Sequence, residues 1–349
     1  MDPRRVVIRP FTPGDYPAEY EIELEWEPSV CVSIDELRRQ DEIQARRADR
    51  LNLKLVAETS QDSRVVGLGV LAHSIANYHP QKFWIWTGVR RAFQGQGVGS
   101  ALYATLEMEA RTRQATALWV SVKEQEERDR AFVERRGFLP QRKVWLSSLD
   151  LLAADLEDRE GRGAKLEADG IRFSTLEAEG SKDPKVRHAV YVLAQTCSRD
   201  TPRVGEFSPS TFEEFQAFQL DTTMALPAGH FLAIDHGEFV GLSTVERDQI
   251  QPDSLRIGFT GVLRAYRGRG IAAELKRRVA RFARDSGFRF LKTGNDSLNG
   301  PILAINRRMG FQPEIVWITY EKKLEPRLWP EGATLLRPGA SSHSPGSYG

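Results

Sequence analysis

The chain has 349 residues, a formal net charge of +1 and two cysteines, Cys31 and Cys197. This length suits two domains that each bury a core, and the balanced charge argues against a basic nucleic-acid-binding arm or an acidic tail. Two cysteines exclude a disulfide framework and fit a reducing compartment. No apolar run approaches the roughly 20 residues of a membrane span, and the N-terminus has no signal-peptide core. We therefore expect a cytoplasmic protein without a membrane or nucleic-acid partner.

Apolar periodicity in the first half predicts alternating strands and helices. Strands are expected at residues 6–11, 53–58, 65–71, 83–89, 115–122 and 144–149, where the last strand closes the sheet of this half. Helices are expected after Asp15 and at residues 34–50, 98–113 and 126–136. The inner face of the third helix is predicted to consist of Val98, Ala101, Leu102, Thr105 and Leu106.

The second half repeats this order. Strands are expected at residues 171–176, 230–234, 239–245, 255–262, 288–294 and 315–322, and helices at residues 184–198, 210–220, 271–285 and 301–309. Each half is predicted to be an α/β (α+β) domain with a mixed, mostly antiparallel central sheet flanked by helices.

The predicted domains are residues 1–151 and 170–326. The charged segment 152–169 is interpreted as a linker with one or two helical turns around residues 151–158. Residues 327–349, rich in Gly, Ser and Pro towards the end, are predicted to be a flexible tail.

Residues 87–100 and 260–273 have closely similar sequences and form an internal repeat. Gly95 and Gly268 are 268 − 95 = 173 residues apart, and Gly137-Phe138 recurs at the same offset as Gly310-Phe311. A repeat of this length indicates two copies of a domain, not a solenoid of short units.

Each copy of the repeat carries two glycines in a turn between a strand and a helix. Glycine permits close approach of the backbone, and the first N–H groups of the helix have no intrahelical partner. Together with the helix dipole they suit a pyrophosphate. For a single copy, a tight turn with solvated arginines is the alternative. A Walker-A loop is excluded because no Lys-Ser/Thr pair follows the glycines, and a Rossmann fingerprint fits poorly because the turn follows a hairpin.

The pattern Gln/Arg-x-x-Gly-x-Gly/Ala resembles the acetyl-CoA signature of the GCN5-related N-acetyltransferases (GNAT). It is matched by Gln94-Gly95-Gln96-Gly97-Val98-Gly99 and by Arg267-Gly268-Arg269-Gly270-Ile271-Ala272. The two Gly-Phe pairs resemble the family's Gly-Phe after its last helix. The resemblance covers roughly residues 5–150 and 170–325, in a tandem layout similar to that of mycothiol synthase, a member of this family.

The resemblance implies that acetyl-CoA is the cofactor and that both glycine turns hold its pyrophosphate. It further implies that the backbone of the strand before each turn pairs with pantetheine, at Val262 and Leu263 and, in the first half, at Val89 and Arg90.

The second half is predicted to be the catalytic one. Asn299, and after it Asn295, match an Asn-rich strand end where the family contacts its cofactor, although turn formation and capping by the Asn and Asp residues of this segment is an alternative. The family's usual Tyr acid is replaced by Asn306, a poor acid for which water could substitute, and by Val133 in the first half. The first turn, with glutamines in place of arginines, is interpreted as a weaker CoA site or a structural relic.

A carboxylate on the central strands is expected to be the general base. Glu246 at the end of its strand is preferred over Asp248 and Asp253, and a solvated charge on an edge strand is the alternative. No residues have metal-ligand spacing, so no metal is predicted.

The predicted function is transfer of an acetyl group from acetyl-CoA to a primary amine of a small molecule by direct attack. The alternatives are a non-catalytic acyl-CoA-binding module and a protein or peptide N-acetyltransferase. A monomer or a homodimer is expected.

Overall fold

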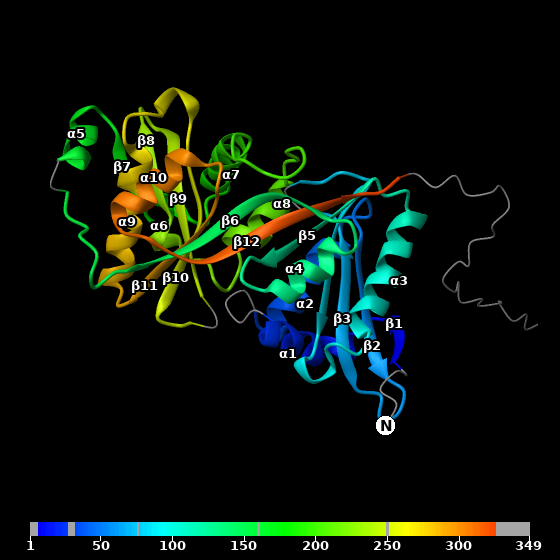
Figure 1. Cartoon of the computed structure of the whole chain (residues 1–349). Coiled ribbons are helices and arrows are strands. Elements are labelled where there is room, and N and C mark those ends of the chain that lie inside the picture. Colours follow the sequence, from blue (N-terminus) through cyan, green and yellow to red (C-terminus); the bar gives the residue numbers. More distant parts are fainter. Residues whose placement is uncertain (1–5, 27–31, 75–76, 159–160, 249–250, 326–349) are drawn as a thin grey trace, which may run out of the picture.

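The computed structural model of the chain describes residues 6–26, 32–74, 77–158, 161–248 and 251–325 (Figure 1). Its strands are β1 (Val6–Pro10), β2 (Asn52–Thr59), β3 (Val65–Ala72), β4 (Lys82–Val89), β5 (Ala117–Lys123), β6 (Leu139–Asp150), β7 (Arg172–Thr175), β8 (Phe231–Asp235), β9 (Glu238–Arg247), β10 (Ser254–Val262), β11 (Phe290–Asp296) and β12 (Gln312–Lys323). Its helices are α1 (Tyr16–Trp26), α2 (Ile34–Ala45), α3 (Val98–Thr112), α4 (Glu127–Glu134), α5 (Arg162–Ala168), α6 (Leu176–Gly180), α7 (Pro184–Ser198), α8 (Phe212–Phe215), α9 (Ile271–Asp285) and α10 (Gly300–Met309).

Both halves contribute to one sheet. Its twelve strands follow the order β1-β2-β3-β4-β5-β12-β6-β11-β10-β9-β8-β7. The neighbouring pairs β4–β5 and β10–β11 are parallel and the other pairs are antiparallel. The predicted class, a mixed and mostly antiparallel sheet with flanking helices, is therefore confirmed.

The last strand of each half lies against the other half. β6 pairs with β11, β12 pairs with β5, and the two long strands pair with each other (Figure 1). Val144 lies opposite Trp317, its counterpart at the 173-residue offset, so this pair marks a local pseudo-twofold axis. The same symmetry relates the hydrogen bond from Ser297 N to Lys143 O (2.9 Å) to that from Glu124 N to Val316 O (2.8 Å).

This exchange corrects the expectation that residues 144–149 close the sheet of the first half. They form part of a strand, as predicted, but its neighbours are β11 and β12. An alternating sequence shows which face of a strand is buried and does not specify the neighbouring strand. The proposed division of the chain at residues 152–169 stays a prediction.

The prediction of one or two helical turns around residues 151–158 is wrong. That segment is a turn followed by irregular backbone, and α5 begins after it. The carboxylate of Asp158 accepts hydrogen bonds from the backbone N–H groups of Arg162 (3.0 Å) and Gly163 (2.7 Å), which satisfies two donors at the start of this helix. Leu166 then anchors the helix in the core.

Two other expected helices are shorter than predicted. The helix expected at residues 34–50 ends at Ala45, and the one expected at residues 210–220 is a single turn, α8, followed by a wider π-type turn. The flexible tail predicted at residues 327–349 and Cys31 lie outside the described residues.

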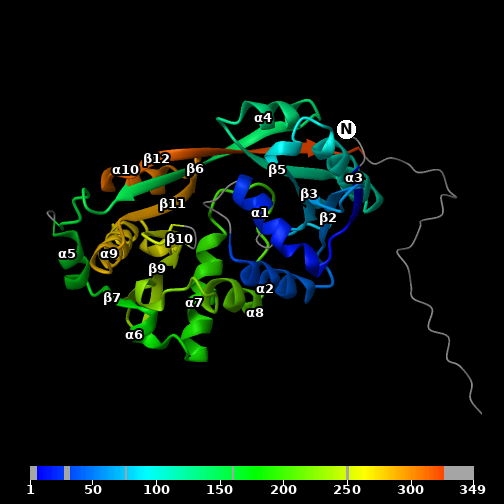
Figure 2. The same ribbon diagram turned by 90° about the horizontal axis from the view of Figure 1, so that it is seen from below.

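Helices cover both faces of the bent sheet. Figure 2 shows α1, α2, α7 and α8 gathered between the two wings of the sheet, whereas α3, α4, α9 and α10 lie outside them. Of the predicted inner face of α3, Val98, Leu102 and Leu106 are at most 2% exposed, whereas Ala101 and Thr105 are half-buried. On the inner side the halves meet through charge: Arg47, in the turn after α2, forms an ion pair with the buried Glu214 of α8 at 3.2 Å.

One charged residue lies inside the core of the second half. Lys276 of α9 is 0% exposed, and its Nζ has no hydrogen-bond partner among the described residues. The ammonium lies 5.1 Å from the centre of the Phe311 ring, and burial lowers its pKa to about 7. At the same position of the repeat the first half has Tyr103, whose hydroxyl accepts a hydrogen bond from Lys322.

We predict that Lys276→Met stabilises the protein. Between pH 7 and 10.5 the unfolded chain binds this proton and the folded chain does not, so unfolding becomes more favourable as the pH falls. The gain should be on the order of 3 kcal/mol at pH 6.5 and should shrink as the pH approaches 10. Urea denaturation at both pH values measures it. Lys185→Met, at an exposed position, is the control, and a gain independent of pH would contradict the prediction.

Candidate active site

In each half a parallel pair of strands diverges. β10 pairs with β11 only from Ser254 to Ile257, and β4 pairs with β5 only from Lys82 to Trp84. Beyond these points β10 and β4 keep their antiparallel neighbours, β9 and β3. The backbone of residues 258–262 therefore has no ladder partner on the β11 side within the described chain, and its polar groups on that side can pair with a ligand.

The glycine turns follow these strands directly. Gly95, Gly97, Gly268 and Gly270 have φ values of 78°, 88°, 79° and 92°, a region that side chains disfavour. Gly97 and Gly270 are the residues before α3 and α9. A Cβ added at Gly97, Gly268 or Gly270 would meet nothing within 4 Å. The first N–H groups of both helices therefore border open space, as an anion site at a helix N-terminus requires.

The residues before the glycines serve the turn itself. Arg267 Nε donates to Val262 O at 3.0 Å, and Gln94 Nε2 donates to Val89 O at the same distance. Arg267 also pairs with Asp200 at 2.6 Å, and the two arginines Arg264 and Arg267 hold the pKa of Asp200 well below its ordinary value. Part of the charge that the sequence assigned to the second turn is thus neutralised, and the exposed Arg269 is its remaining arginine.

The first turn receives a cation from elsewhere in the chain. Arg128 of α4 donates to Gln94 Oε1 at 3.2 Å, and its Nη2 lies 3.1 Å from the position of a Cβ at Gly95. Arg128 lies outside the repeated motif, so the residues of the motif alone indicate less positive charge at the first turn than the structure has there. The difference in charge between the two turns is smaller than their own residues suggest.

A buried amide and a half-buried amide meet where the strands of the second half diverge. Asn306 of α10 is 4% exposed and donates from Nδ2 to Asn295 Oδ1 on β11 at 2.6 Å. The same positions of the first half hold Val122 and Val133, both packed in its core. Structure thus joins the predicted residues Asn295 and Asn306 into one polar pair, for which the first half has an apolar pair.

Asn299 stands immediately before α10. Its backbone N–H donates to Asp296 O at 3.0 Å, whereas its side chain makes no capping hydrogen bond. Capping by this side chain is therefore not realised, whereas the turn that the alternative also included is formed by Asp296, whose Oδ1 accepts the N–H of Leu298 at 2.7 Å. Among the described residues the side chain of Asn299 has no hydrogen-bond partner that would prevent another contact.

Glu246 pairs with β10 on one side and forms an isolated bridge to Ala225 on the other, and its side chain is half-buried. The alternative of a solvated charge on an edge strand is therefore wrong. Glu246 is opposite Arg256, one position from Ile257, where β10 and β11 cease to pair. Burial raises the pKa of its carboxyl, partly opposed by Arg256 and reinforced by Asp248.

The two other candidate carboxylates are placed differently. Asp248 is buried and forms an ion pair with Arg256 at 3.6 Å. Asp253 precedes β10, and its carbonyl accepts the backbone N–H of Arg289 at 2.8 Å, so it lies at the end of β10 opposite to the glycine turn. Glu246 stays the best placed of the three.

The comparison with known families identifies the repeated unit. The model of the acetyltransferase (GNAT) family matches residues 15–138 and again residues 189–311. The chain belongs to the GNAT family. Each match contains one diverging strand pair and one glycine turn, so the tandem arrangement expected from the sequence is confirmed.

Solved GNAT structures share the fold over nearly the whole chain. A GCN5-related N-acetyltransferase from Sphaerobacter thermophilus is 20% identical, with 93% of this chain and 97% of that chain covered and a TM-score of 0.65. A tandem GNAT protein from the clavulanic acid biosynthesis pathway, solved without AcCoA, is 19% identical, with 93% and 100% covered and a TM-score of 0.69. A fungal glucosamine N-acetyltransferase region is 15% identical, with 92% and 38% covered and a TM-score of 0.67. Among curated proteins none matches the chain.

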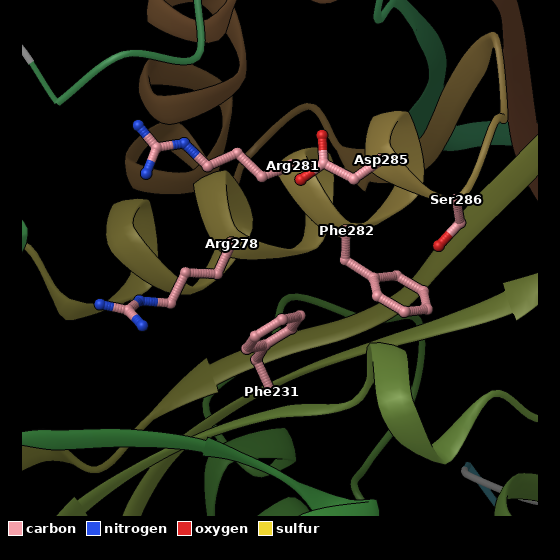
Figure 3. Close-up of a pocket in the computed structure, with 6 residues that line it drawn as sticks. All are labelled: Phe231, Arg278, Arg281, Phe282, Asp285 and Ser286. Carbon is pink, nitrogen blue, oxygen red and sulfur yellow. The ribbon is translucent and has the colours of Figure 1, made fainter.

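A shallow pocket of about 420 Å³ lies away from the glycine turn, along the C-terminal part of α9. Figure 3 shows Phe231 and Phe282 facing each other in it, with ring centres 6.3 Å apart. Its arginines are engaged: Arg278 donates to Glu274 and Arg281 donates to Leu156 O. We do not assign this pocket to the GNAT site.

Within the described ranges no group of three or more His, Cys, Asp or Glu residues is placed to hold a metal ion. In the same part of the chain, none of the helices combines the length and apolar character needed to span a membrane.

Sequence reasoning missed Asp200 and Arg128, which belong to no motif and reach the turns from distant segments. It also missed Arg142 and Asp296, which form an ion pair between the halves at 2.9 Å. Only the repeat offered a signal: Arg128 and Asp296 correspond to Pro301 and Lys123, so each differs in charge from its counterpart.

We predict that Gly270→Glu weakens binding of CoA by at least about tenfold, or 1.4 kcal/mol, and abolishes activity, because it places a negative charge at the start of α9. Gly97→Glu should leave activity intact. Calorimetric titration with CoA gives the affinity and the number of sites per chain. Gly270→Asn is the control, since asparagine tolerates positive φ without adding charge. Activity that survives Gly270→Glu but is lost with Gly97→Glu would assign catalysis to the first half.

Proposed function

We propose that the chain transfers an acetyl group from acetyl-CoA to a primary amine of a small molecule, with the second half as the catalytic one. The observation that carries this proposal is a diverging strand pair: one strand, β10, leads into an open, left-handed glycine turn, and the other, β11, carries Asn295, which is hydrogen-bonded to the buried Asn306. Membership of an acetyltransferase family supports the reaction type.

The residues present fit acetyl-CoA. Backbone N–H groups of residues 268–272 would hold the pyrophosphate, with the exposed Arg269 as a nearby cation, because a Cβ at Gly268 or Gly270 would meet no neighbouring atom within 4 Å. The edge of β10 that has no strand partner would bind pantetheine up to Val262, whose carbonyl already accepts from Arg267. The N–H of the next residue, Leu263, is engaged by Val240 O. When bound, acetyl-CoA supplies an activated acyl group.

Glu246 is the proposed general base. Its raised pKa makes it a better proton acceptor for an ammonium near neutral pH than an ordinary carboxylate. Asn306 has no proton to give at this pH, so we assign it a hydrogen-bond donor role at Nδ2 and leave the proton donation to water.

Packing of the two halves against each other on the inner side of the sheet favours a small molecule as the acetyl acceptor. A loop of the second half packs over the sheet of the first half, where a Cβ at Gly205 would lie 2.8 Å from the Trp119 ring. In the same region Arg142 donates to Pro202 O at 3.1 Å. A fungal relative is named as a glucosamine N-acetyltransferase region, which acts on a small amine.

The competing proposals are a non-catalytic acyl-CoA-binding module and a protein or peptide N-acetyltransferase. Turnover of acetyl-CoA in the presence of amines excludes the first, and acetylation of free amines but not of peptides excludes the second. We also propose that the protein acts in the cytoplasm as a monomer or homodimer, without a nucleic-acid or membrane partner.

We predict that Glu246→Gln lowers kcat by about 100-fold, the usual scale for a general base. The wild-type rate should rise with pH through a pKa above that of an ordinary carboxyl, and the variant should lose this rise. Steady-state rates between pH 5 and 9 measure both effects. Glu238→Gln, at the exposed start of the same strand, is the control, and a variant with an unchanged rate and pH profile would exclude Glu246 as the base.

We further predict that the double variant Asn295→Val/Asn306→Val folds but turns over at least about tenfold more slowly. It replaces a hydrogen-bonded amide pair by the apolar pair of the first half, which changes the free energy of unfolding by only about 1 kcal/mol. The single variant Asn306→Val should cost more stability, because it removes the shorter of the two hydrogen bonds to Asn295 Oδ1 and leaves only that from Thr293, at 3.3 Å. Thermal unfolding and turnover are measured together, and unchanged turnover in the double variant would show that the pair has no catalytic part.

A further inference from the structure

A strand of the first half borders the site of the second half. β6 continues along β11 to its last residue, where Asp296 lies opposite Val144. Two residues before Val144, Arg142 reaches across and forms an ion pair with Asp296 at 2.9 Å. Both side chains are shielded from water, with exposures of 21% and 5%.

Asp296 organises the turn into α10. Its Oδ1 accepts the backbone N–H of Leu298 at 2.7 Å, and its carbonyl accepts that of Asn299 at 3.0 Å. The next residue is the first of α10, the helix that carries Asn306. Asp296 therefore shapes the turn before α10 through both its carboxylate, which binds Leu298, and its carbonyl, which binds Asn299, and Arg142 forms an ion pair with that carboxylate.

Arg142 is itself fixed. It donates to Pro202 O at 3.1 Å, and burial lowers the pKa of its guanidinium while Asp296 opposes this effect. Removal of the arginine would leave Asp296 buried with its charge uncompensated, which destabilises the local structure strongly.

Symmetry shows that the pair is not a general feature of the exchanged strands. At the corresponding positions of the repeat, the first half has Lys123 in place of Asp296, and β12 has Ile315 in place of Arg142. The backbone hydrogen bonds of the exchange are nevertheless alike in both halves. The ion pair thus occurs only beside the turn that carries the asparagines.

We propose that Arg142 is a positioning residue for the cofactor site of the second half. Acting through Asp296, it fixes the turn at residues 296–299 and with it the amide of Asn299. This inference rests on the proposed binding of acetyl-CoA by the second half. The cofactor site of the second half is then incomplete without Arg142 of the first half, so the two halves form one functional unit.

The test measures the Kd of the full-length chain for acetyl-CoA by calorimetry, together with the Tm. Arg142→Leu should raise the Kd by about tenfold or more, and Arg142→Lys, which restores the charge, should recover most of the affinity. Arg47→Leu is the matched control, because it breaks another ion pair between the halves, to Glu214, outside the turn. It should lower the Tm and leave the Kd unchanged.

A wild-type Kd in Arg142→Leu overturns the inference, as does an equal rise of the Kd in Arg47→Leu. If Arg142→Leu does not fold, the double variant Arg142→Leu/Asp296→Asn removes both charges and leaves no buried charge unpaired. Its Kd should rise as far as that of Asp296→Asn alone, whereas wild-type affinity in the double variant contradicts the proposal. Failure of the wild-type chain to bind acetyl-CoA would instead refute the proposed function itself.

Discussion

The antiparallel pairing of β6 with β12 is the constraint on which the rest of the structure depends. Each of these strands also supplies the outer neighbour of a diverging strand, β12 for β5 and β6 for β11. A buried strand needs partners for its backbone groups. Because β5 and β11 are fully paired on the exchanged side, they can separate from β4 and β10 on the other. The gap that suits a ligand in each half thus depends on a strand from its partner half.

On this symmetric backbone the side chains have taken different roles. The first half fills the point of divergence with Val122 and Val133 and gains an apolar core. The second half keeps Asn295 and Asn306 there and leaves Asn306 Oδ1 without a partner among the described residues. Buried polar groups cost stability unless they are satisfied. Retention of such groups in one half only is what a site reserved for a ligand would require.

The sequence predicted what depends on neighbouring residues and missed what depends on distant ones. Strands, most helices and the positive-φ glycines follow from local periodicity and from the conformational freedom of glycine. Three features do not follow from local sequence: the neighbours of β6, the contact of Arg128 with the first turn, and the ion pair between Arg267 and Asp200. Each requires knowing which segments the folded chain brings together. The helix misplaced to residues 151–158 is a similar case, because Asp158 starts α5 through its side chain and not through an apolar pattern.

The glycines themselves do not separate the two halves. Gly95 and Gly97 have nearly the φ values of Gly268 and Gly270, so the path of the chain from strand to helix requires glycine in both copies. A glycine motif therefore indicates the backbone geometry of the turn, and only the residues around it indicate whether a ligand binds there. In the second half these surroundings are the pair Asn295–Asn306, Asn299, whose side chain makes no capping hydrogen bond, and Asp296, which forms an ion pair with the other half. Around the first they are Arg128 and two buried valines. If the first half binds a ligand, it does so without the polar groups that distinguish the second.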